Sequence, residues 1–324
     1  MKSRRILAVC LLLLCWSTAD AQFFRGIDEW LRQRQARQPY DTTYIYRPQE
    51  RWLVRERSFF DGQRIGMVAR TGDDLSSLSV GSGLKFRQSL GVGYRNINLD
   101  IGFNPFKTNQ TLALDVSTYG NRLCFTGYFG FLGGMSGLAE VNGTTVELPR
   151  ETVGGMRGVL ELCYSFNGSR FSMAAARAQS YRQLRSAGSL LALASAQFYG
   201  AAITESAPAE LQLHNAISAL LGLGLGYGYN WVPSEHWLIH LCLTETVGVL
   251  NYSMLTMGEQ QVDFREKTPV LAGTAALAVC YYYKKFYFSA SSRFENLLHL
   301  SVGDTDFFNG FTTSQAVLSA GIRF

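Results

Sequence analysis

Apolar and polar residues alternate along most of this chain, from about residue 51 to its end at residue 324. The segment 97–103 shows the pattern, with apolar residues at every second position: Ile97, Leu99, Ile101 and Phe103. Similar segments of roughly ten residues recur to the C-terminus, with turn residues between them. A period of two predicts β-strands whose side chains point alternately to two faces. The pattern therefore predicts an all-β protein.

Alternation alone does not separate a soluble β-sandwich from a membrane barrel, in which the apolar face meets lipid and the polar face lines the lumen. The C-terminus favours the barrel. One face of the last predicted strand carries only apolar residues and ends on an aromatic one: Ala316, Leu318, Ala320, Ile322 and Phe324. Such a strand is typical of the terminal segment that the barrel assembly machinery recognises in outer-membrane barrels. We therefore expect Phe324 to be an assembly signal and the assembly machinery to be a partner.

Short and long connections tend to alternate, as they do in outer-membrane barrels with short periplasmic turns and long outer loops. Five dipeptides mark tight turns: Arg95-Asn96, Gly120-Asn121, Asn167-Gly168, Pro233-Ser234 and Lys284-Lys285. Four longer and more polar stretches are 133–155, 202–215, 254–269 and 301–312. This alternation favours the barrel over the sandwich.

Aromatic residues gather near the predicted short turns. They are Tyr94, Tyr119, Phe166, Phe171, Trp231, Trp237, Tyr281, Tyr282, Tyr283, Phe286 and Phe324. A ring of aromatic side chains at the membrane interface is typical of barrels in a bilayer. We therefore expect contact with outer-membrane lipid.

These features predict a transmembrane antiparallel up-and-down β-barrel of about twelve strands over residues 51–324, the first at 52–60. The stretch 170–199 is too long for one strand, and splitting it in two breaks the alternation of connections, so fourteen strands remain open. Both termini should be periplasmic, which requires an even number.

The N-terminus has the form of a secretory signal peptide over residues 1–21. Basic residues precede the apolar run 6–16, and Ala19-Asp20-Ala21 is an A-x-A cleavage site. The apolar run is shorter than the roughly 20 residues that span a bilayer. A lipoprotein signal ending at Cys15 is the alternative, but a small residue does not precede that cysteine. We expect export to the outer membrane of a Gram-negative-type cell, with cleavage after Ala21.

Residues 22–50 differ from the rest and are expected to form a periplasmic extension. Within them, 23–38 fits a short basic amphipathic helix ended by Pro39, with Phe24, Ile27, Trp30 and Leu31 on one face. The whole chain has a formal charge of +5, part of which leaves with the signal. So small an excess gives no reason to expect a nucleic-acid partner.

Three segments resemble an outer-membrane family of Bacteroidetes-type bacteria known as domain of unknown function 4421. Asp41-Thr42-Thr43-Tyr44-Ile45 is similar to its entry segment, and Leu90-Gly91-Val92-Gly93-Tyr94, with 97–103 after it, to its first glycine-aromatic hairpin. The segment 183–189, Gln-Leu-Arg-Ser-Ala-Gly-Ser, is similar to its "Q-x-x-S-A-G-S" element. The resemblance covers about residues 40–324. It implies a barrel and a location in the outer membrane, and it supplies neither an activity nor catalytic residues.

Candidate catalytic chemistry is sparse. His299 and Ser301 would share a strand face with Glu295, and a Ser–His contact is the minimum of a nucleophilic site. That face points to the lumen, whereas lipid substrates reach the outer wall. Among the histidines, His236 and His240 lie about 13 Å apart on a strand, too far for a shared metal. We expect no metal and no cofactor.

Several charged residues occupy the alternate strand positions whose side chains should point into the lumen: Arg87, Arg95, Asp100, Asp115, Arg122, Arg157, Glu161, Arg293 and Glu295. They could line a pathway for a small solute of unknown identity, or fill a closed lumen with ion pairs. The leading interpretation is a non-enzymatic barrel, either a transport channel or a structural surface protein. The alternative is a lipid-modifying enzyme, an acyl hydrolase or transferase.

Four cysteines follow the signal, all with inward parity: Cys124, Cys163, Cys242 and Cys280. Residues equidistant from the turn of an antiparallel hairpin face each other. If the turns fall at the centres of the loops 133–155 and 254–269, Cys124 faces Cys163 and Cys242 faces Cys280. Their separation would permit disulfides, although we expect reduced thiols.

Overall fold

The computed structural model describes residues 21–37, 39–71, 74–106, 112–141, 143–203, 213–257, 260–264, 270–301 and 305–324. The predicted signal peptide, residues 1–21, lies outside them except for Ala21. The chain divides into two compact units, 1–39 and 40–324. The first contains the helix α2 (Ala21–Ala36), which matches the amphipathic helix that the sequence predicts.

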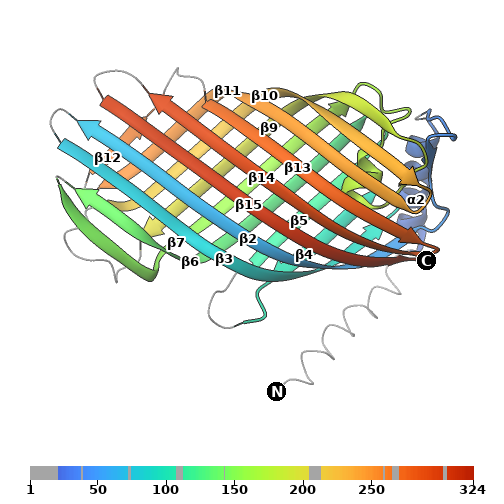
Figure 1. The fold of residues 1–324 in the computed structure, drawn as a ribbon, viewed down its shortest axis with the longest axis horizontal. Helices are drawn as coiled ribbons and strands as arrows, with labels where there is room; N and C mark the ends of the chain where they lie inside the picture. The colour runs from blue at the N-terminus through green and yellow to red at the C-terminus, as the bar shows by residue number, and fades with distance from the viewer. Residues whose placement is uncertain are drawn as a thin grey trace. The chain divides into compact units, whose positions relative to one another are not determined.

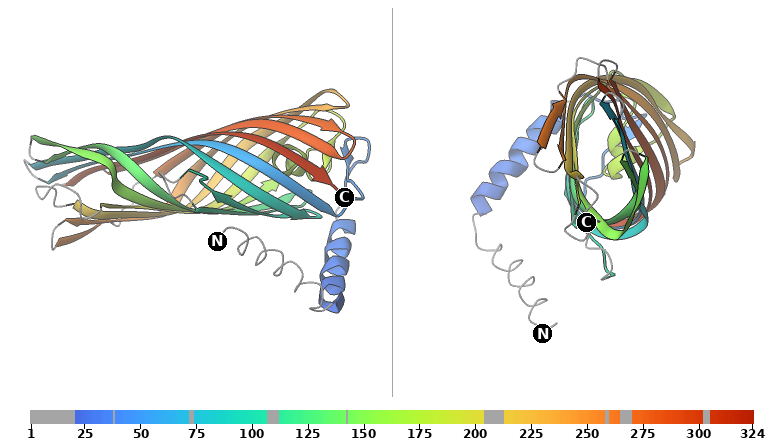
Figure 2. Two further views of the ribbon diagram at one scale, coloured as in Figure 1. Left: turned by 90° about the horizontal axis from the view of Figure 1, so that it is seen from below. Right: turned by 90° about the vertical axis from the view of Figure 1, so that its left-hand side faces the viewer.

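The second unit is a closed antiparallel barrel (Figures 1 and 2). Twelve strands of the described residues form its wall: β2 (Trp52–Thr71), β3 (Asp74–Tyr94), β4 (Ile97–Phe103), β5 (Leu112–Tyr119), β6 (Leu123–Val141), β7 (Thr144–Ser165), β9 (Ala187–Ile203), β10 (Leu213–Ser234), β11 (Trp237–Met257), β13 (Val270–Tyr283), β14 (Phe286–Ser301) and β15 (Thr305–Arg323). Pairing of β15 with β2 and of β10 with β11 completes the ring. The predicted all-β barrel of twelve strands is confirmed.

Three further short strands of the described residues lie outside the wall. β12 (Gln260–Phe264) extends the end of β11 as a hairpin. β1 (Ile45–Tyr46) pairs with β8 (Arg182–Gln183), and both precede wall strands at the end of the barrel where the tight turns lie. The stretch that left the strand number open thus contributes one wall strand, β9. The residues before β9 fold inside the ring.

The wall narrows along its length, because β4 and β5 are much shorter than their neighbours. Beyond their ends β3 pairs directly with β6, from Gly81 opposite Ser136 to Ser76 opposite Val141. The approach is so close that a Cβ on Gly137 would lie 1.9 Å from the carbonyl oxygen of Ser79. At this step the barrel changes from twelve strands to ten.

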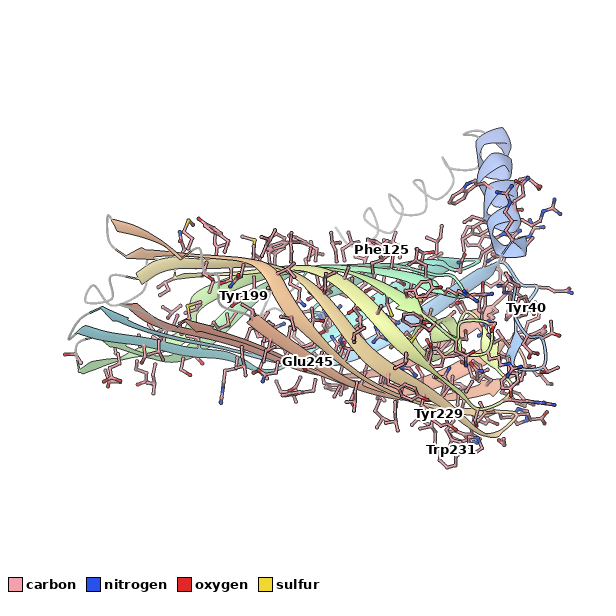
Figure 3. The ribbon with its side chains drawn as sticks, turned by 90° about the horizontal axis from the view of Figure 1, so that it is seen from above. Tyr40, Phe125, Tyr199, Tyr229, Trp231 and Glu245 are labelled. Atoms are coloured by element: carbon pink, nitrogen blue, oxygen red, sulfur yellow. The ribbon has the colours of Figure 1, made fainter. Side chains whose placement is uncertain are left out.

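The outer wall is apolar. On β10 every second side chain points outward and is exposed: Leu221, Leu223, Leu225, Tyr227, Tyr229 and Trp231. Figure 3 shows Tyr229 and Trp231 on the outer side of the wall. An exposed apolar belt of this extent is far larger than the patches on soluble monomers. In the part of the chain that is described, no helix is long and apolar enough to cross a membrane, a finding that does not bear on crossing by strands.

Two of the charged residues predicted to point into the lumen do not do so, and three of the aromatic residues predicted for the ring at the membrane interface are not part of it. Arg95 occupies the turn between β3 and β4, and Arg122 is exposed just before β6. Both lie just beyond the end of a strand, where side chains no longer alternate between the two faces of the wall. Tyr119 and Tyr282 point into the barrel, and Phe171 belongs to the segment inside the ring, so these three are buried instead of facing the membrane interface.

Candidate functional site

Residues 166–186 turn back into the barrel and form what we call the plug. It contains a single π-helical turn, η1 (Ala174–Ala178), whose residues are alanines except for Arg177. Four of its five residues are buried, and Figure 2 shows this segment (yellow-green) inside the ring. Small side chains let the backbone of the turn fit between strands that face each other across a narrow lumen.

The plug and the wall share one apolar core. Phe171, Met173 and the η1 alanines pack with residues of eight wall strands, among them Leu53, Tyr119 and Leu238. Phe171 is fully buried, and a Cβ on Gly228 of β10 would lie 2.7 Å from its ring. The glycine therefore makes room for the plug.

Wall side chains also bind the backbone of the plug. They donate hydrogen bonds to five of its carbonyl oxygens: Asn230 to Ser172 (3.0 Å), Tyr282 to Ala175 (2.8 Å), Arg57 to Arg177 (3.3 Å), Arg55 to Ala178 (3.2 Å) and Arg323 to Gln179. Three of the donors are arginines at the C-terminal end of the turn, where cations suit the carbonyl groups that a helix leaves without partners. The wall thus satisfies polar groups that would otherwise be buried unpaired.

Gln183 joins the plug to both the wall and the N-terminal segment. Its Oε1 accepts from the backbone N–H of Ser172 and from Asn230, each at 3.0 Å, and Asn230 in turn contacts His240 at 2.8 Å. Its backbone pairs with Ile45 of β1, which is buried in the plug core. The last part of the extension expected over 22–50 is thus joined to the barrel.

Asp41 lies at the start of this N-terminal segment. The hydroxyl and backbone N–H of Thr43 donate to it at 2.6 and 3.0 Å, and these bonds, helped by Arg170 at 3.3 Å, hold the pKa of the Asp41 carboxyl below its usual range. The Asp41 N–H donates to Ser169 O at 2.9 Å. Asp41 therefore fixes the approach of the chain to the plug.

Next to the plug the lumen holds a polar chamber of about 210 Å³. Ion pairs line one side of it. Arg55 donates from two nitrogens to Asp100, both side chains being 1% exposed. Arg87 lies 3.2 Å from Asp61 and 3.7 Å from Asp115, with its guanidinium over the ring of Phe59.

A second group of ion pairs crosses the lumen. Arg157 of β7 pairs with Glu295 of β14, although four wall strands separate β7 from β14 on one side and six on the other. Arg293 lies 2.6 Å from Glu295, and Glu161 lies 3.6 Å from Arg293 and 3.4 Å from Arg177 of η1. The network therefore ties opposite walls to each other and to the plug.

Beyond the chamber, at the step, a second apolar core fills the lumen. It includes Ile65, Val80, Met135 and Leu148, all at most 1% exposed. Tyr199 of β9 stacks on Phe311 of β15 with ring centres 5.2 Å apart, again joining strands on opposite sides of the ring. The chamber is thus bounded by an apolar core at each end.

Of the predicted lumen charges, seven lie in this network: Arg87, Asp100, Asp115, Arg157, Glu161, Arg293 and Glu295. The catalytic candidate is not assembled among the described side chains. Glu295 is engaged by two arginines, and the side chains of His299 and Ser301 lie outside the described residues. Within those residues no group of three or more His, Cys, Asp or Glu could hold a metal.

One of the two predicted cysteine pairings is found and the other is not. Cys124 and Cys163 are register partners in β6 and β7, as predicted, and all four described cysteines are free and buried. The other pairing is wrong, because Cys242 faces Ala276 and Cys280 faces Leu238. A four-residue offset corresponds to about 13 Å along a strand. The register of β11 with β12 and β13 is centred near residue 259. For Cys242 to face Cys280, the centre would have to lie at residue 261.

The sequence profile of the family described as domain of unknown function (DUF4421) matches residues 39–324. This chain belongs to that family. The comparison with curated proteins gives no match.

Solved structures similar to this chain are barrels. The outer membrane protease OmpT of Escherichia coli is 9% identical over 85% of this chain and 98% of its own, with a TM-score of 0.42. The β domain of the Bordetella autotransporter BrkA is 12% identical over 85% and 100%, with a TM-score of 0.37. The toluene transporter TodX of Pseudomonas putida is 9% identical over 86% and 91%, with a TM-score of 0.31.

The segments that carry the DUF4421 resemblance meet at the plug end. The first, 41–45, and the third, 183–189, pair through Ile45 and Gln183. In the second, a Cβ on Gly91 would lie 1.9 Å from Asp100 and 2.9 Å from Arg55, so this glycine makes room for the buried ion pair. These motifs are recognisable in the sequence, but the plug is not. The spacing of Gln183 from the alternating segment that follows it gave no indication that the side chain points inward.

Proposed function

We propose that this protein is a non-enzymatic outer-membrane barrel whose lumen is closed, and that it serves as a structural or surface protein and not as an open channel. It is exported with a signal peptide cleaved after Ala21, and its termini lie on the periplasmic side. The observation that carries the proposal is the plug, which is bound to the wall by apolar packing and by hydrogen bonds to five of its carbonyl groups.

Energetics favour closure as the resting state. Moving the plug away would leave the buried donors of Tyr282 and Arg323 without their carbonyl acceptors and expose the apolar core that it shares with eight strands. A buried donor left without a partner costs about 1–3 kcal/mol. Even with the plug gone, Arg157–Glu295 and Tyr199–Phe311 would still bridge the lumen. A solute would have to cross both regions.

Conductance in planar lipid bilayers tests the proposal. The purified mature protein should insert without producing a steady open level, whereas an open porin in the same bilayer gives long-lived conductance steps. A reproducible steady level from the wild-type protein, scaling with salt concentration, would show that the lumen is a passage and would contradict the proposal.

The same preparation tests the enzymatic alternative. Labelled phospholipid and lipopolysaccharide incubated with folded protein should remain unchanged, because Glu295 is held by Arg157 and Arg293. Turnover that disappears in the Glu295→Gln and Ser301→Ala variants would favour a lipid-modifying enzyme instead.

Gel electrophoresis tests whether the wall is closed. Since a closed barrel has no edge strand, the unboiled, detergent-extracted protein should migrate faster than the boiled protein. Equal mobility of the two samples would contradict a closed barrel.

Phe324 offers a test of assembly. Its backbone exchanges two 3.0 Å hydrogen bonds with Trp52, and its ring is exposed on the outer wall. If it signals to the barrel assembly machinery, Phe324→Asp should lower the amount of protein in the outer membrane while Phe324→Tyr should not. Equal amounts of all three proteins would remove this role.

A further inference from the structure

Two tight turns of the barrel have an unusual backbone. Arg95, between β3 and β4, has a φ of 54°, and Lys284, between β13 and β14, has a φ of 51°. Such values suit glycine or asparagine, which two-residue hairpin turns normally use. In the described residues Gln179 of the plug is the third non-glycine residue with positive φ. Two strained turn positions are therefore occupied by cations.

Each of these cations directly follows an outward aromatic residue. Arg95 follows Tyr94, whose ring centre is 4.7 Å from that of Trp52. Lys284 follows the exposed Tyr283, and its ammonium lies 5.3 Å from that ring. Trp and Tyr on the outside of a membrane protein lie at the level of the lipid headgroups. The strained cations therefore stand at that same level.

Other cations continue this level around the wall. Arg51 is exposed beside Trp52 at the start of β2, Lys285 is exposed before β14, and Arg122 is exposed before β6 and donates to Tyr164 at 3.2 Å. In wall order the five cations extend from β6 to β13, an arc of eight of the twelve strands. We call Arg51, Arg95, Arg122, Lys284 and Lys285 the basic arc.

We propose that the basic arc is a binding surface for the headgroups of anionic phospholipids in the leaflet on the plug side of the membrane. The proposal rests on the membrane placement proposed above. A layer of headgroups meets an arc that follows the circumference of the barrel at one level, whereas a compact protein partner would meet only a few adjacent turns. Each cation near an anionic surface contributes about 1 kcal/mol, about a fivefold change in binding.

A variant carrying Arg95→Gly, Lys284→Gly and Lys285→Gly tests the proposal. Glycine accepts the left-handed backbone at both strained positions, so the barrel should fold and stay heat-modifiable. Wild-type and variant protein are reconstituted in vesicles of phosphatidylcholine with a minor fraction of phosphatidylglycerol, and the lipids retained on extraction are counted by native mass spectrometry. Wild type should enrich phosphatidylglycerol, and the variant should lose this enrichment by about fivefold per cation removed.

Two controls separate charge from structure. The variant Arg95→Lys, Lys284→Arg, Lys285→Arg keeps the charge and should keep the enrichment. Arg170→Gln removes a cation of the plug that is paired with Asp41 and is not part of the arc, and should also leave the enrichment unchanged.

Two further measurements show whether the arc binds a lipid headgroup or free phosphate, and provide a second variant in case the first misfolds. Inorganic phosphate at matched ionic strength should displace the lipid no better than sodium chloride does. If the glycine variant misfolds, Arg122→Gln gives a second test. Equal enrichment in wild type and in folded variants overturns the lipid site, whereas a steady conductance overturns only the closed lumen.

Discussion

The two ends of the lumen are closed by different means. At the end with the tight turns, an added segment of chain enters the ring and is held by the wall, chiefly through its backbone carbonyl groups. At the step, the wall itself narrows from twelve strands to ten and its own side chains meet across the lumen. The first closure can be separated from the barrel in principle, while the second is part of the wall. Variants can therefore test the two independently.

The largest contrast should come from two buried aromatic residues. Phe171→Ala in the plug and Phe311→Ala at the step should each cost about 3–5 kcal/mol, the usual price of truncating a buried phenylalanine. Because Cys280 lies against the plug, with Gln179 3.6 Å from its sulfur, only Phe171→Ala should speed its alkylation in the folded protein. Unfolding in denaturant and thiol labelling measure the two effects. Equal labelling in both variants would mean that the closures are not independent.

The ion pair across the lumen should give the next largest effect. Arg157→Ala leaves the half-buried Glu295 with Arg293 alone, and the loss of one hydrogen bond to a charged group costs about 1.5–3 kcal/mol. The double variant Arg157→Met, Glu295→Leu should recover most of the loss, because a well-packed apolar pair often replaces a buried ion pair without cost. Denaturant unfolding compares the three proteins. A double variant as unstable as the single one would assign the loss to packing instead of charge.

A smaller effect is expected at the glycine that faces the plug. Gly228→Ala places a Cβ 2.7 Å from the ring of Phe171 and should cost about 1–3 kcal/mol as overpacking. Gly66→Ala on the wall strand β2 is the matched control, because its Cβ would meet nothing within 4 Å. It should be neutral or slightly stabilising. Similar losses at both positions would argue against a tightly packed plug.

The cysteines give a test that should leave both closures intact. Refolding under oxidising conditions should link Cys124 to Cys163, which are register partners, and should not link Cys242 to Cys280. Peptide mapping identifies the disulfides. A Cys242–Cys280 link would show that the register of β11 and β13 is different from the one described.

Sequence alternation predicted the wall well because successive wall residues point alternately into the lumen and outward, which imposes a period of two. Residues that leave the strand have no such constraint. Arg95 and Arg122 stand at turns, and their parity carried no information about the lumen. The register of β11 with β13 depends on where the turn falls, and the short strand β12 shifted it away from the centre of the loop.

The plug could not be predicted in this way. Ala174-Ala175-Ala176 has no polar face, since all of its sides meet either wall side chains or other parts of the plug. Its wall donors, such as Asn230, Tyr282 and Arg323, lie between 58 and 144 residues away in the sequence. What the sequence did provide was the length of the stretch 170–199 and the resemblance at Gln183, and both point to the region where the plug lies.

Hydrogen–deuterium exchange of the folded protein in detergent tests the central claim, that the plug is part of the folded interior. The backbone N–H groups of Phe171, Ser172, Ala175 and Ser180 have acceptors within the plug. Peptides covering these residues should therefore exchange as slowly as those of β9, and Phe171→Ala should make them exchange faster without affecting β9. Complete exchange of the wild-type plug peptides at the earliest time point, with β9 protected, would contradict the account.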